Sequence, residues 1–220
     1  MESYVLMAGL ASRQLACIVG GILLAGCAQF GIPDFPPELR SPLRAPGELF
    51  VVYHPQSVLG FGHTGLIVAA PGGGEFVRYD QYASAEIAYE RRVARGEAHF
   101  WEAVTSRLPS IGGYTREYVT RHRAPSAAAL VGRAEYAVPV AVGAEARRRI
   151  YEAAEQRFAE AGELESSEAR RYYLVQNNCQ HFLLDLLHAG GIPEDHYFPK
   201  YLMEAVLEQY RTRNGGQPQR

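Results

Sequence analysis

YYLVQNNCQHFLLDLLHAGG, residues 172–191, contains the start, the apolar face and the end of one helix. Asn177 and Asn178 suit the start, because an Asn side chain accepts hydrogen bonds from the unpaired N–H groups of a first helical turn. Apolar residues then recur at i, i+3 and i+4 spacing, which predicts a buried face. Gly190 and Gly191, followed by a proline, indicate the end. The pattern therefore predicts a helix that starts near Asn178.

Cys179 lies in the first turn of this predicted helix. The N–H groups of that turn and the positive end of the helix dipole favour a thiolate, which is the nucleophilic form of cysteine. Upstream, the sequence FGHTGLIV places His63 at the head of an apolar, β-branched run that predicts a buried strand. A cysteine at a helix start and a histidine on a strand are the parts of a cysteine hydrolase or acyltransferase. Such residues meet in space rather than along the chain.

A third candidate follows from the register of a predicted hairpin. The sequence PGGG separates two strand-like runs, and if it forms a four-residue loop, His63 faces Tyr82. Asp80 then lies diagonally beside His63, within reach to orient its imidazole ring. A change of one residue in the turn would place Gln81 or Tyr79 there instead. We therefore expect Asp80 to be the third catalytic residue, with these two as alternatives.

Stabilisation of an oxyanion is expected beside the thiol. The N–H of Cys179 and the side-chain amide of Gln176 are the candidate donors, supported by Asn178. The plainer interpretation is that the two asparagines only cap the helix and that Cys179 is an inert buried thiol. His181 would point away from the thiol and serve the cap. The remaining histidines lack metal-ligand spacing, so neither a metal nor a cofactor is expected.

The N-terminal region carries a short apolar run, LACIVGGILLA, that ends in Leu24-Ala25-Gly26-Cys27. The run has the length of a signal-peptide core and is too short to span a bilayer. The final tetrapeptide resembles the lipobox of bacterial lipoproteins, which implies cleavage before Cys27 and lipidation of its thiol and amino group. Ala28 after it suggests the periplasmic face of the outer membrane. A plain secretory signal, a buried helix with a chance cysteine, and a start at Met7 instead of Met1 stay open.

This interpretation divides the chain into four parts. Residues 1–26 are the signal peptide, and residues 27–46, which contain five prolines, form an extended tether to the membrane. Residues 47–212 form the catalytic domain, and residues 213–220 are a polar tail. The mature chain would then keep Cys179 as its one free thiol, without a disulfide partner.

The element pattern of the domain is α+β, with an antiparallel sheet packed against the helix that carries the cysteine. The middle segment, residues 85–107, is charged and partly helical. A net charge of −2 gives no electrostatic reason to expect nucleic acid. Strands are predicted at 48–54, 62–70, 75–83, 117–122 and 135–142, and further helices at 144–161 and 199–210.

Two motifs together resemble a known group of enzymes. GHTGLIV followed by NNCQHFLLDLL resembles the permuted papain-like enzymes of the NlpC-type superfamily. NCQHF is similar to the NCEHF of lecithin:retinol acyltransferase-like proteins and to the NCNHF of PPPDE thiol peptidases, whose histidine motif also reads H-T-G. The resemblance implies a permuted papain-like fold, with Cys179 as nucleophile and His63 as general base and then acid. The acyltransferases would have a second histidine on the next strand, where this chain has Arg78, Tyr79 and Asp80.

The resulting hypothesis is a lipid-anchored periplasmic cysteine hydrolase that cleaves an amide bond, with peptidoglycan peptides as the most plausible substrate. The first alternative is a thioesterase or a phospholipid acyl hydrolase or acyltransferase, which predicts an exposed apolar groove beside the thiol. The second is a non-catalytic binding or scaffold lipoprotein. A peptidase predicts a polar cleft lined by Tyr53, Tyr79, Tyr82 and Trp101. The expected partners are the membrane and a peptide or acyl substrate, and the oligomeric state stays open.

Overall fold

The computed structural model describes residues 33–55, 62–83, 95–96, 115–162, 171–172, 177–195 and 199–215. These residues form an α+β fold with an antiparallel sheet and helices, as predicted. The strands are β1 (Leu49–His54), β2 (His63–Ala69), β3 (Phe76–Ala83), β4 (Thr115–Ala124), β5 (Tyr136–Pro139) and the short β6 (Arg171–Tyr172). The helices are α5 (Ala144–Gly162), α6 (Cys179–Ala189) and α7 (Pro199–Arg213), with short 3₁₀ helices η1 (Pro37–Leu39) and η3 (Ala127–Leu130).

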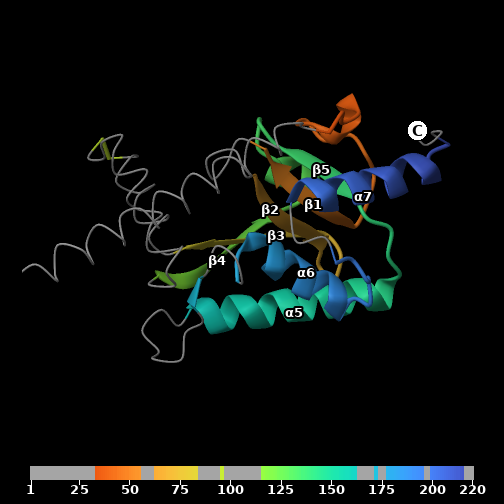
Figure 1. Cartoon of the computed structure of the whole chain (residues 1–220). Helices are drawn as coiled ribbons and strands as arrows, with labels where there is room; N and C mark the ends of the chain where they lie inside the picture. Colours follow the sequence, from red (N-terminus) through yellow and green to blue (C-terminus); the bar gives the residue numbers. More distant parts are fainter. Residues whose placement is uncertain are drawn as a thin grey trace, which may run out of the picture.

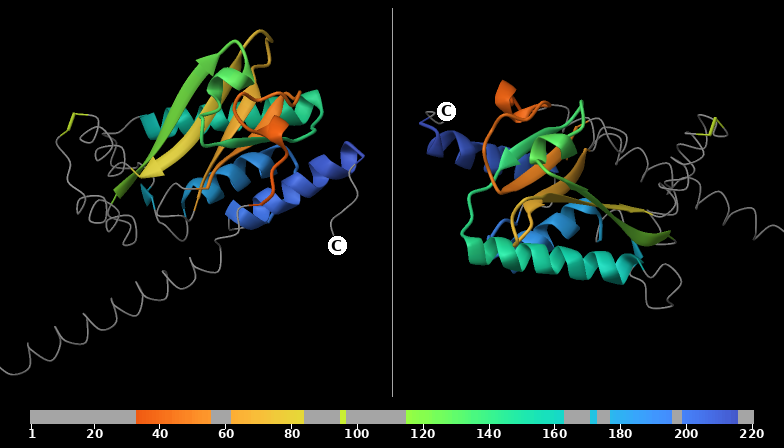
Figure 2. Two further views of the ribbon diagram at one scale, coloured as in Figure 1. Left: turned by 90° about the horizontal axis from the view of Figure 1, so that it is seen from above. Right: turned by 180° about the vertical axis from the view of Figure 1, so that it is seen from behind.

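The strands lie in the order β5-β1-β2-β3-β4-β6, and neighbouring strands are antiparallel (Figure 1). Every residue of β2 is buried, as expected of a strand that is covered on both faces. Helix α6 lies against β2 and β3, and α5 runs beside α6 and contacts β4 (Figure 2). Helix α7 contacts β1 and β5, while η3 contacts β2 and β3. The start of α6 is thereby held against the centre of the sheet.

The hairpin of β2 and β3 has the expected register. Gly65 pairs with Asp80, and Ala69 pairs with Phe76, so PGGG lies in the turn between the strands. Successive residues of each strand point to opposite faces, so the register determines which side chains of β3 share a face with His63. The position of the candidate site therefore follows from the length of this turn.

The three predicted helices are present, each within three residues of the predicted bounds. The predicted strands at 117–122 and 135–142 correspond to β4, which is longer, and to β5, which is shorter. Several predictions concern residues outside the described ranges. These are the signal peptide with Cys27, nearly all of the middle segment, Trp101, Gln176, and the last part of the polar tail.

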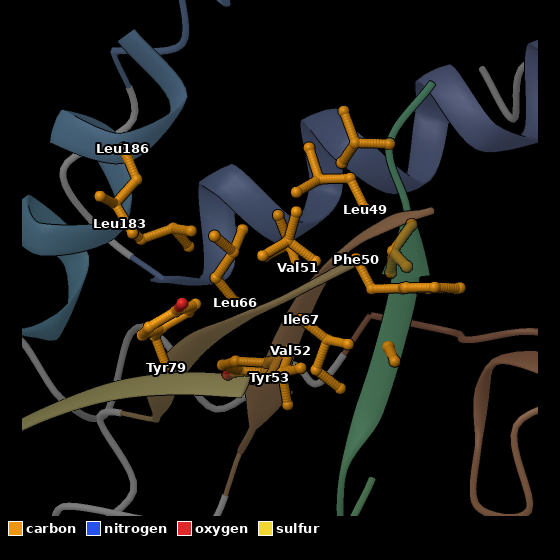
Figure 3. Close-up of a cluster of buried hydrophobic side chains, with 14 of the residues drawn as sticks. Leu49, Phe50, Val51, Val52, Tyr53, Leu66, Ile67, Tyr79, Leu183 and Leu186 are labelled. Atoms are coloured by element: carbon orange, nitrogen blue, oxygen red, sulfur yellow. The ribbon is translucent and has the colours of Figure 1, made fainter. Parts of the chain in front are cut away.

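The apolar face of α6 packs on the sheet as its spacing predicts. Leu183 and Leu186 lie beside Leu66 of β2 and Tyr79 of β3 (Figure 3). All four side chains are almost completely buried, and each buried leucine contributes about 1.5–3 kcal/mol of transfer free energy. This packing fixes the position of the helix, and with it that of the residues in its first turn.

The prediction of an extended tether that ends at residue 46 is wrong for the described residues 33–46. Phe35 stacks on Tyr136 of β5, with the ring centroids 4.1 Å apart, and Leu39 of η1 is fully buried. The prediction counted prolines and overlooked the apolar side chains between them. A proline-rich backbone is compatible with packing when such side chains have a surface to cover. The folded domain therefore includes residues before position 47.

Polar contacts join the same segment to α7. The Tyr210 hydroxyl donates a hydrogen bond of 3.3 Å to the carboxylate of Glu38, and the Arg211 guanidinium donates to the carbonyl oxygen of Asp34. Among the described residues, no helix is both long enough and apolar enough to cross a membrane.

Replacement of Leu39 by alanine tests the packing of this segment. Loss of a fully buried leucine is expected to lower the free energy of unfolding by about 2–5 kcal/mol, because it leaves a cavity. The exposed neighbour Arg44, replaced by alanine, is the matched control, with an expected change within about 0.5 kcal/mol. Urea unfolding at equilibrium measures both values. Equal, small changes in the two variants would show that the segment is a free tether.

Candidate active site

Cys179 is the first residue of α6, and Asn178 is its N-cap. The carboxamide oxygen of Asn178 accepts hydrogen bonds from the N–H groups of Gln180 (2.9 Å) and His181 (3.1 Å). The His181 ring lies 3.0 Å from the same oxygen, so this histidine belongs to the cap. The Asn178 side chain thus accepts from the two residues after Cys179 and not from the N–H of Cys179 itself. Gln176, the second predicted donor, lies outside the described residues.

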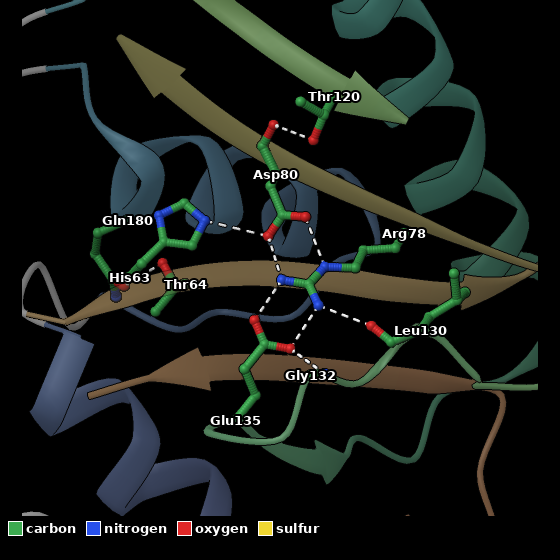
Figure 4. A network of polar contacts seen from close by, with 9 residues as sticks. All are labelled: His63, Thr64, Arg78, Asp80, Thr120, Leu130, Gly132, Glu135 and Gln180. Atoms are coloured by element: carbon green, nitrogen blue, oxygen red, sulfur yellow. Dashed lines mark hydrogen bonds and ion pairs between the residues drawn. The ribbon is translucent and has the colours of Figure 1, made fainter. Parts of the chain in front are cut away.

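His63 and Asp80 are in direct contact. Nε2 of His63 lies 3.1 Å from Oδ1 of Asp80, and both side chains are more than nine-tenths buried (Figure 4). A carboxylate accepts hydrogen bonds, so Nε2 is the nitrogen that carries a proton, and Nδ1 is left to face another group. The structure thus places Asp80, rather than Gln81 or Tyr79, beside His63. Glycine is required at position 65, because a Cβ there would lie 2.2 Å from Oδ1 of Asp80.

Cys179 and His63 are close enough for each to shift the pKa of the other, through charge and hydrogen bonding. Burial alone would lower the pKa of His63, but the facing sulfur and the Asp80 carboxylate together raise it above its ordinary value. Burial alone would raise the pKa of Cys179, but the imidazolium charge and its hydrogen bond lower it. The two groups therefore favour the thiolate–imidazolium pair over the neutral pair.

Thr64 is a second partner of the sulfur that the sequence analysis missed. Both its backbone N–H and its side chain hydrogen-bond Cys179, and both interactions lower the pKa of the thiol. Its hydroxyl lies 3.2 Å from Oε1 of Gln180, and its single proton serves either that oxygen or the sulfur. The contact ties the strand to the first turn of α6. The one weak signal for it in the sequence is the threonine of the H-T-G motif. A threonine on a β-strand is too common to be singled out on that basis.

Arg78 holds the carboxylate of Asp80 from the other side. Its Nε donates to Oδ2 at 2.6 Å and one terminal nitrogen donates to Oδ1 at 3.0 Å. Burial alone would raise the pKa of Asp80, but His63 and Arg78 lower it well below its usual range. Asp80 is therefore a carboxylate at all physiological pH values, oriented by two cationic partners.

Glu135, in the loop before β5, completes this network. Its two oxygens accept from the terminal nitrogens of Arg78 at 2.6 and 2.8 Å, and the carbonyl oxygen of Leu130 accepts a further bond of 2.7 Å (Figure 4). The backbone N–H of Gly132 also donates to Glu135 at 2.6 Å. Because Glu135 is distant from Arg78 along the chain, no spacing in the sequence indicates this contact.

Tyr82 stacks on the ring of His63, with centroids 4.6 Å apart and an angle of 9° between the planes. This contact restricts rotation of the imidazole about its own bonds. The other tyrosines predicted to line a polar cleft are buried instead. Tyr79 is fully buried and its hydroxyl donates to Glu155 of α5, while Tyr53 is 4% exposed and packs near Phe35. The alternation of β3 directs Tyr79 to the face that α5 and α6 cover, so its predicted position in a cleft is wrong.

A second buried network fixes the chain just before Cys179. Asn177 accepts a hydrogen bond of 3.2 Å from Gln81 of β3 and donates one of 3.1 Å to Glu117 of β4. Arg157 of α5 donates to the same Glu117 carboxylate at 2.9 Å. Asn177 is therefore an anchor rather than a cap.

Comparison of the chain with protein-family models, with curated proteins and with solved structures finds no match. The chemistry of the site is therefore inferred from its own geometry. Within the described ranges, no group of three or more His, Cys, Asp or Glu side chains has the arrangement of a metal site.

Replacement of Arg78 by methionine tests the electrostatic network. Asp80 and Glu135 would then be buried without their shared cation, and the expected loss of unfolding free energy at pH 7 is about 3–5 kcal/mol. Both carboxylates have lowered pKa values in the folded protein, so their stabilising contribution is present above the ordinary carboxylate pKa and is lost as the pH falls. Without Arg78 their pKa values rise, so the difference between wild type and variant shrinks at acid pH.

The matched control for this prediction is Arg148→Met. Arg148 also bonds two carboxylates, those of Glu145 and Glu152, but on the exposed face of α5. Little change in stability is expected there, because solvent screens such pairs. Urea unfolding compares each of the two variants with the wild type at pH 7 and at pH 4. A loss for Arg78→Met that is as small as that of the control would contradict the proposed network.

Proposed function

We propose that the protein is a cysteine hydrolase that cleaves an amide bond through an acyl-enzyme. The observation that carries the proposal is the connected series Cys179–His63–Asp80, in which the sulfur contacts the imidazole and the imidazole lies 3.1 Å from the carboxylate. A buried thiolate–imidazolium pair supplies both a nucleophile and a proton donor. A structural cysteine requires neither.

In the first half of the proposed reaction, the Cys179 thiolate attacks the carbonyl carbon of the substrate and forms a C–S bond. The carbonyl oxygen becomes an oxyanion, and the N–H of Cys179, at the positive end of α6, is placed to stabilise it. His63 then donates its proton to the nitrogen of the scissile bond. The C–N bond breaks, and the amine leaves.

In the second half, water attacks the thioester. His63, now neutral, accepts a proton from the water, and Asp80 stabilises the imidazolium that forms. The tetrahedral intermediate collapses, the carboxylic acid leaves, and the thiolate–imidazolium pair is restored. Asp80 acts in this scheme by orientation and charge, and it takes no proton, because its pKa is held low.

The arrangement is consistent with a permuted papain-like fold, in which the histidine strand precedes the cysteine helix. Here β2 carries His63, α6 carries Cys179, and α6 packs on β2. The resemblance of GHTGLIV and NCQHF to the NlpC-type superfamily supports the same assignment. The strand after His63 carries Arg78, Tyr79 and Asp80 where the acyltransferase branch would have a second histidine, and this departure counts against that branch.

The proposed location is the periplasmic face of the outer membrane, through lipidation of Cys27. Peptidoglycan peptides are the amide substrates of that compartment, so we propose them as the substrate class. Because residues 33–46 pack on the domain, a chain of residues 28–32 would join it to the anchor. Such a chain spans at most roughly 20 Å.

This short reach favours one second candidate, a hydrolase of membrane-proximal esters or thioesters, which the same acyl-enzyme chemistry would serve. One observation opposes it. In the described part of the chain, the large apolar side chain that is strongly exposed is Tyr201 of α7, and Cys179 is itself 6% exposed. The described residues thus offer no apolar surface of the size that a lipid chain would need beside the thiol.

Digestion of purified peptidoglycan stem peptides by the full-length protein tests the proposal. Mass spectrometry is expected to show cleavage at an amide bond, with a new amine and a new carboxylate in equal amounts. Cys179→Ala and His63→Ala are each expected to lower the rate by at least about 10³-fold, because they remove the nucleophile and its proton donor. Asp80→Asn retains the pair, and its rate is expected to fall less.

The matched control is His188→Ala, which changes an exposed histidine at the C-terminal end of α6 and should leave the rate unchanged. Phospholipid vesicles in place of peptides test the second candidate. Equal residual rates in wild type and Cys179→Ala on both kinds of substrate would leave the scaffold interpretation and contradict the proposed enzyme.

A further inference from the structure

Gln81 of β3 has a buried acceptor that no group among the described residues satisfies. Its side chain is fully buried, and in that part of the chain its carbonyl oxygen Oε1 has no hydrogen-bond partner. Buried polar atoms are nearly always paired, since an unpaired one has lost its hydrogen bonds to water without replacement. An unpaired acceptor at a candidate site therefore indicates a missing donor.

The orientation of this amide follows from its neighbours. The Glu117 carboxylate can only accept, so it requires that the nitrogen of Asn177 donates to it, at 3.1 Å. The oxygen of Asn177 is then turned to Gln81, where it must meet a donor, and Nε2 of Gln81 donates to it at 3.2 Å. Rotation of the Gln81 amide by 180° would set two oxygens against each other. The atom of the Gln81 amide that lacks a partner is therefore the acceptor Oε1 and not the donor Nε2.

Gln81 lies across the strand pair from a residue that interacts with the proposed nucleophile. The register that pairs Gly65 with Asp80 sets Gln81 opposite Thr64, whose N–H and side chain contact the sulfur of Cys179. The other end of the Gln81 amide bonds Asn177, two residues before the cysteine. Gln81 therefore bridges the two segments that hold the sulfur, and it is separate from the His63–Asp80 pair on the opposite face of β3.

We propose that Oε1 of Gln81 accepts a hydrogen bond from an N–H of the substrate's acyl portion, so that the site selects peptide-like acyl groups. An oxyester or a simple fatty acyl chain has no N–H and would leave the acceptor unpaired. A site that requires a donor discriminates strongly against an analogue that lacks it. The inference rests on the proposed function, because it assumes that Cys179 is acylated.

Three p-nitrophenyl esters test the inference with the full-length protein: those of N-acetylglycine, N-acetylsarcosine and O-acetylglycolic acid. They share the leaving group and differ at one position, which is N–H, N-methyl or oxygen. In each case the sulfur of Cys179 attacks the ester carbonyl, the C–O bond breaks, and p-nitrophenolate leaves. Rates are divided by those of free cysteine with the same ester, which removes differences in intrinsic reactivity.

The normalised kcat/KM of the N-acetylglycine ester is expected to exceed those of the other two by about tenfold or more, because one hydrogen bond to a buried acceptor is gained. In Gln81→Met, which removes the acceptor at similar length, the three values are expected to become equal within about twofold. Gln156→Met makes the same exchange on the exposed face of α5 and should retain the preference.

The outcomes separate the two levels of the proposal. If release of p-nitrophenolate depends on Cys179 but the wild type does not prefer the N-acetylglycine ester, the inference about Gln81 is overturned and the hydrolase proposal stays intact. If Gln81→Met retains the preference, the inference about Gln81 is likewise overturned. Absence of Cys179-dependent release with all three esters overturns both. If circular dichroism shows that Gln81→Met does not fold, the comparison of the three esters on the wild type decides alone.

Discussion

The contact between the Cys179 sulfur and the His63 imidazole is the interaction on which the rest of the site depends. It places two groups that can ionise in the interior, where an isolated charge is strongly disfavoured. Each becomes stable only because a partner of opposite charge adjoins it. The pair in turn requires Asp80 on the far side of the ring, since a lone imidazolium facing a thiolate would lack its second hydrogen bond.

From this pair the charges alternate outward through the structure. In the proposed ion pair the sulfur is negative and the imidazolium positive, and Asp80, Arg78 and Glu135 continue the alternation. Each inner charge thus lies between charges of the opposite sign, and the series ends at Glu135, which a backbone N–H also satisfies. Such a series holds the imidazole in one orientation and keeps the carboxylate that faces it ionised.

A second polar network holds the segment before Cys179 in position. Glu117, Asn177 and Gln81 join β4, the segment before α6, and β3. With the apolar face of α6 on the sheet, it fixes the first helical turn from two directions. The two networks lie on opposite faces of β3, because Asp80 and Gln81 are consecutive residues of the strand. One strand therefore supplies both the carboxylate that contacts the histidine and the amide that bonds Asn177.

Local patterns in the sequence were sufficient to predict the helix at Asn178, the β2–β3 hairpin and, through its turn length, the position of Asp80 beside His63. These features depend on spacing within about 20 residues of the chain. Glu135 and Thr64 were missed for a different reason. Nothing in the spacing connects Glu135 with Arg78, and Thr64 acquires its contact with the sulfur only when α6 packs on β2.

The packing of residues 33–46 on the domain is another feature that local sequence patterns do not predict. A proline-rich composition is shared by free linkers and by segments that lie extended on a domain. Only the tertiary surface offered by Tyr136 and α7 distinguishes the two. Composition therefore misplaced the start of the domain, although hydrophobic periodicity placed its helices correctly.

The most direct test of the central claim is a pH titration of the ultraviolet absorbance by which a thiolate differs from a thiol. The difference between wild type and Cys179→Ser isolates this one residue and does not depend on access of a reagent. The thiolate–imidazolium pair predicts a midpoint well below the ordinary thiol pKa of about 8.5, and a clearly higher midpoint in His63→Ala, where burial of the thiol is no longer offset by the imidazolium charge. A midpoint at or above 8.5 in the wild type that His63→Ala does not move would contradict the account.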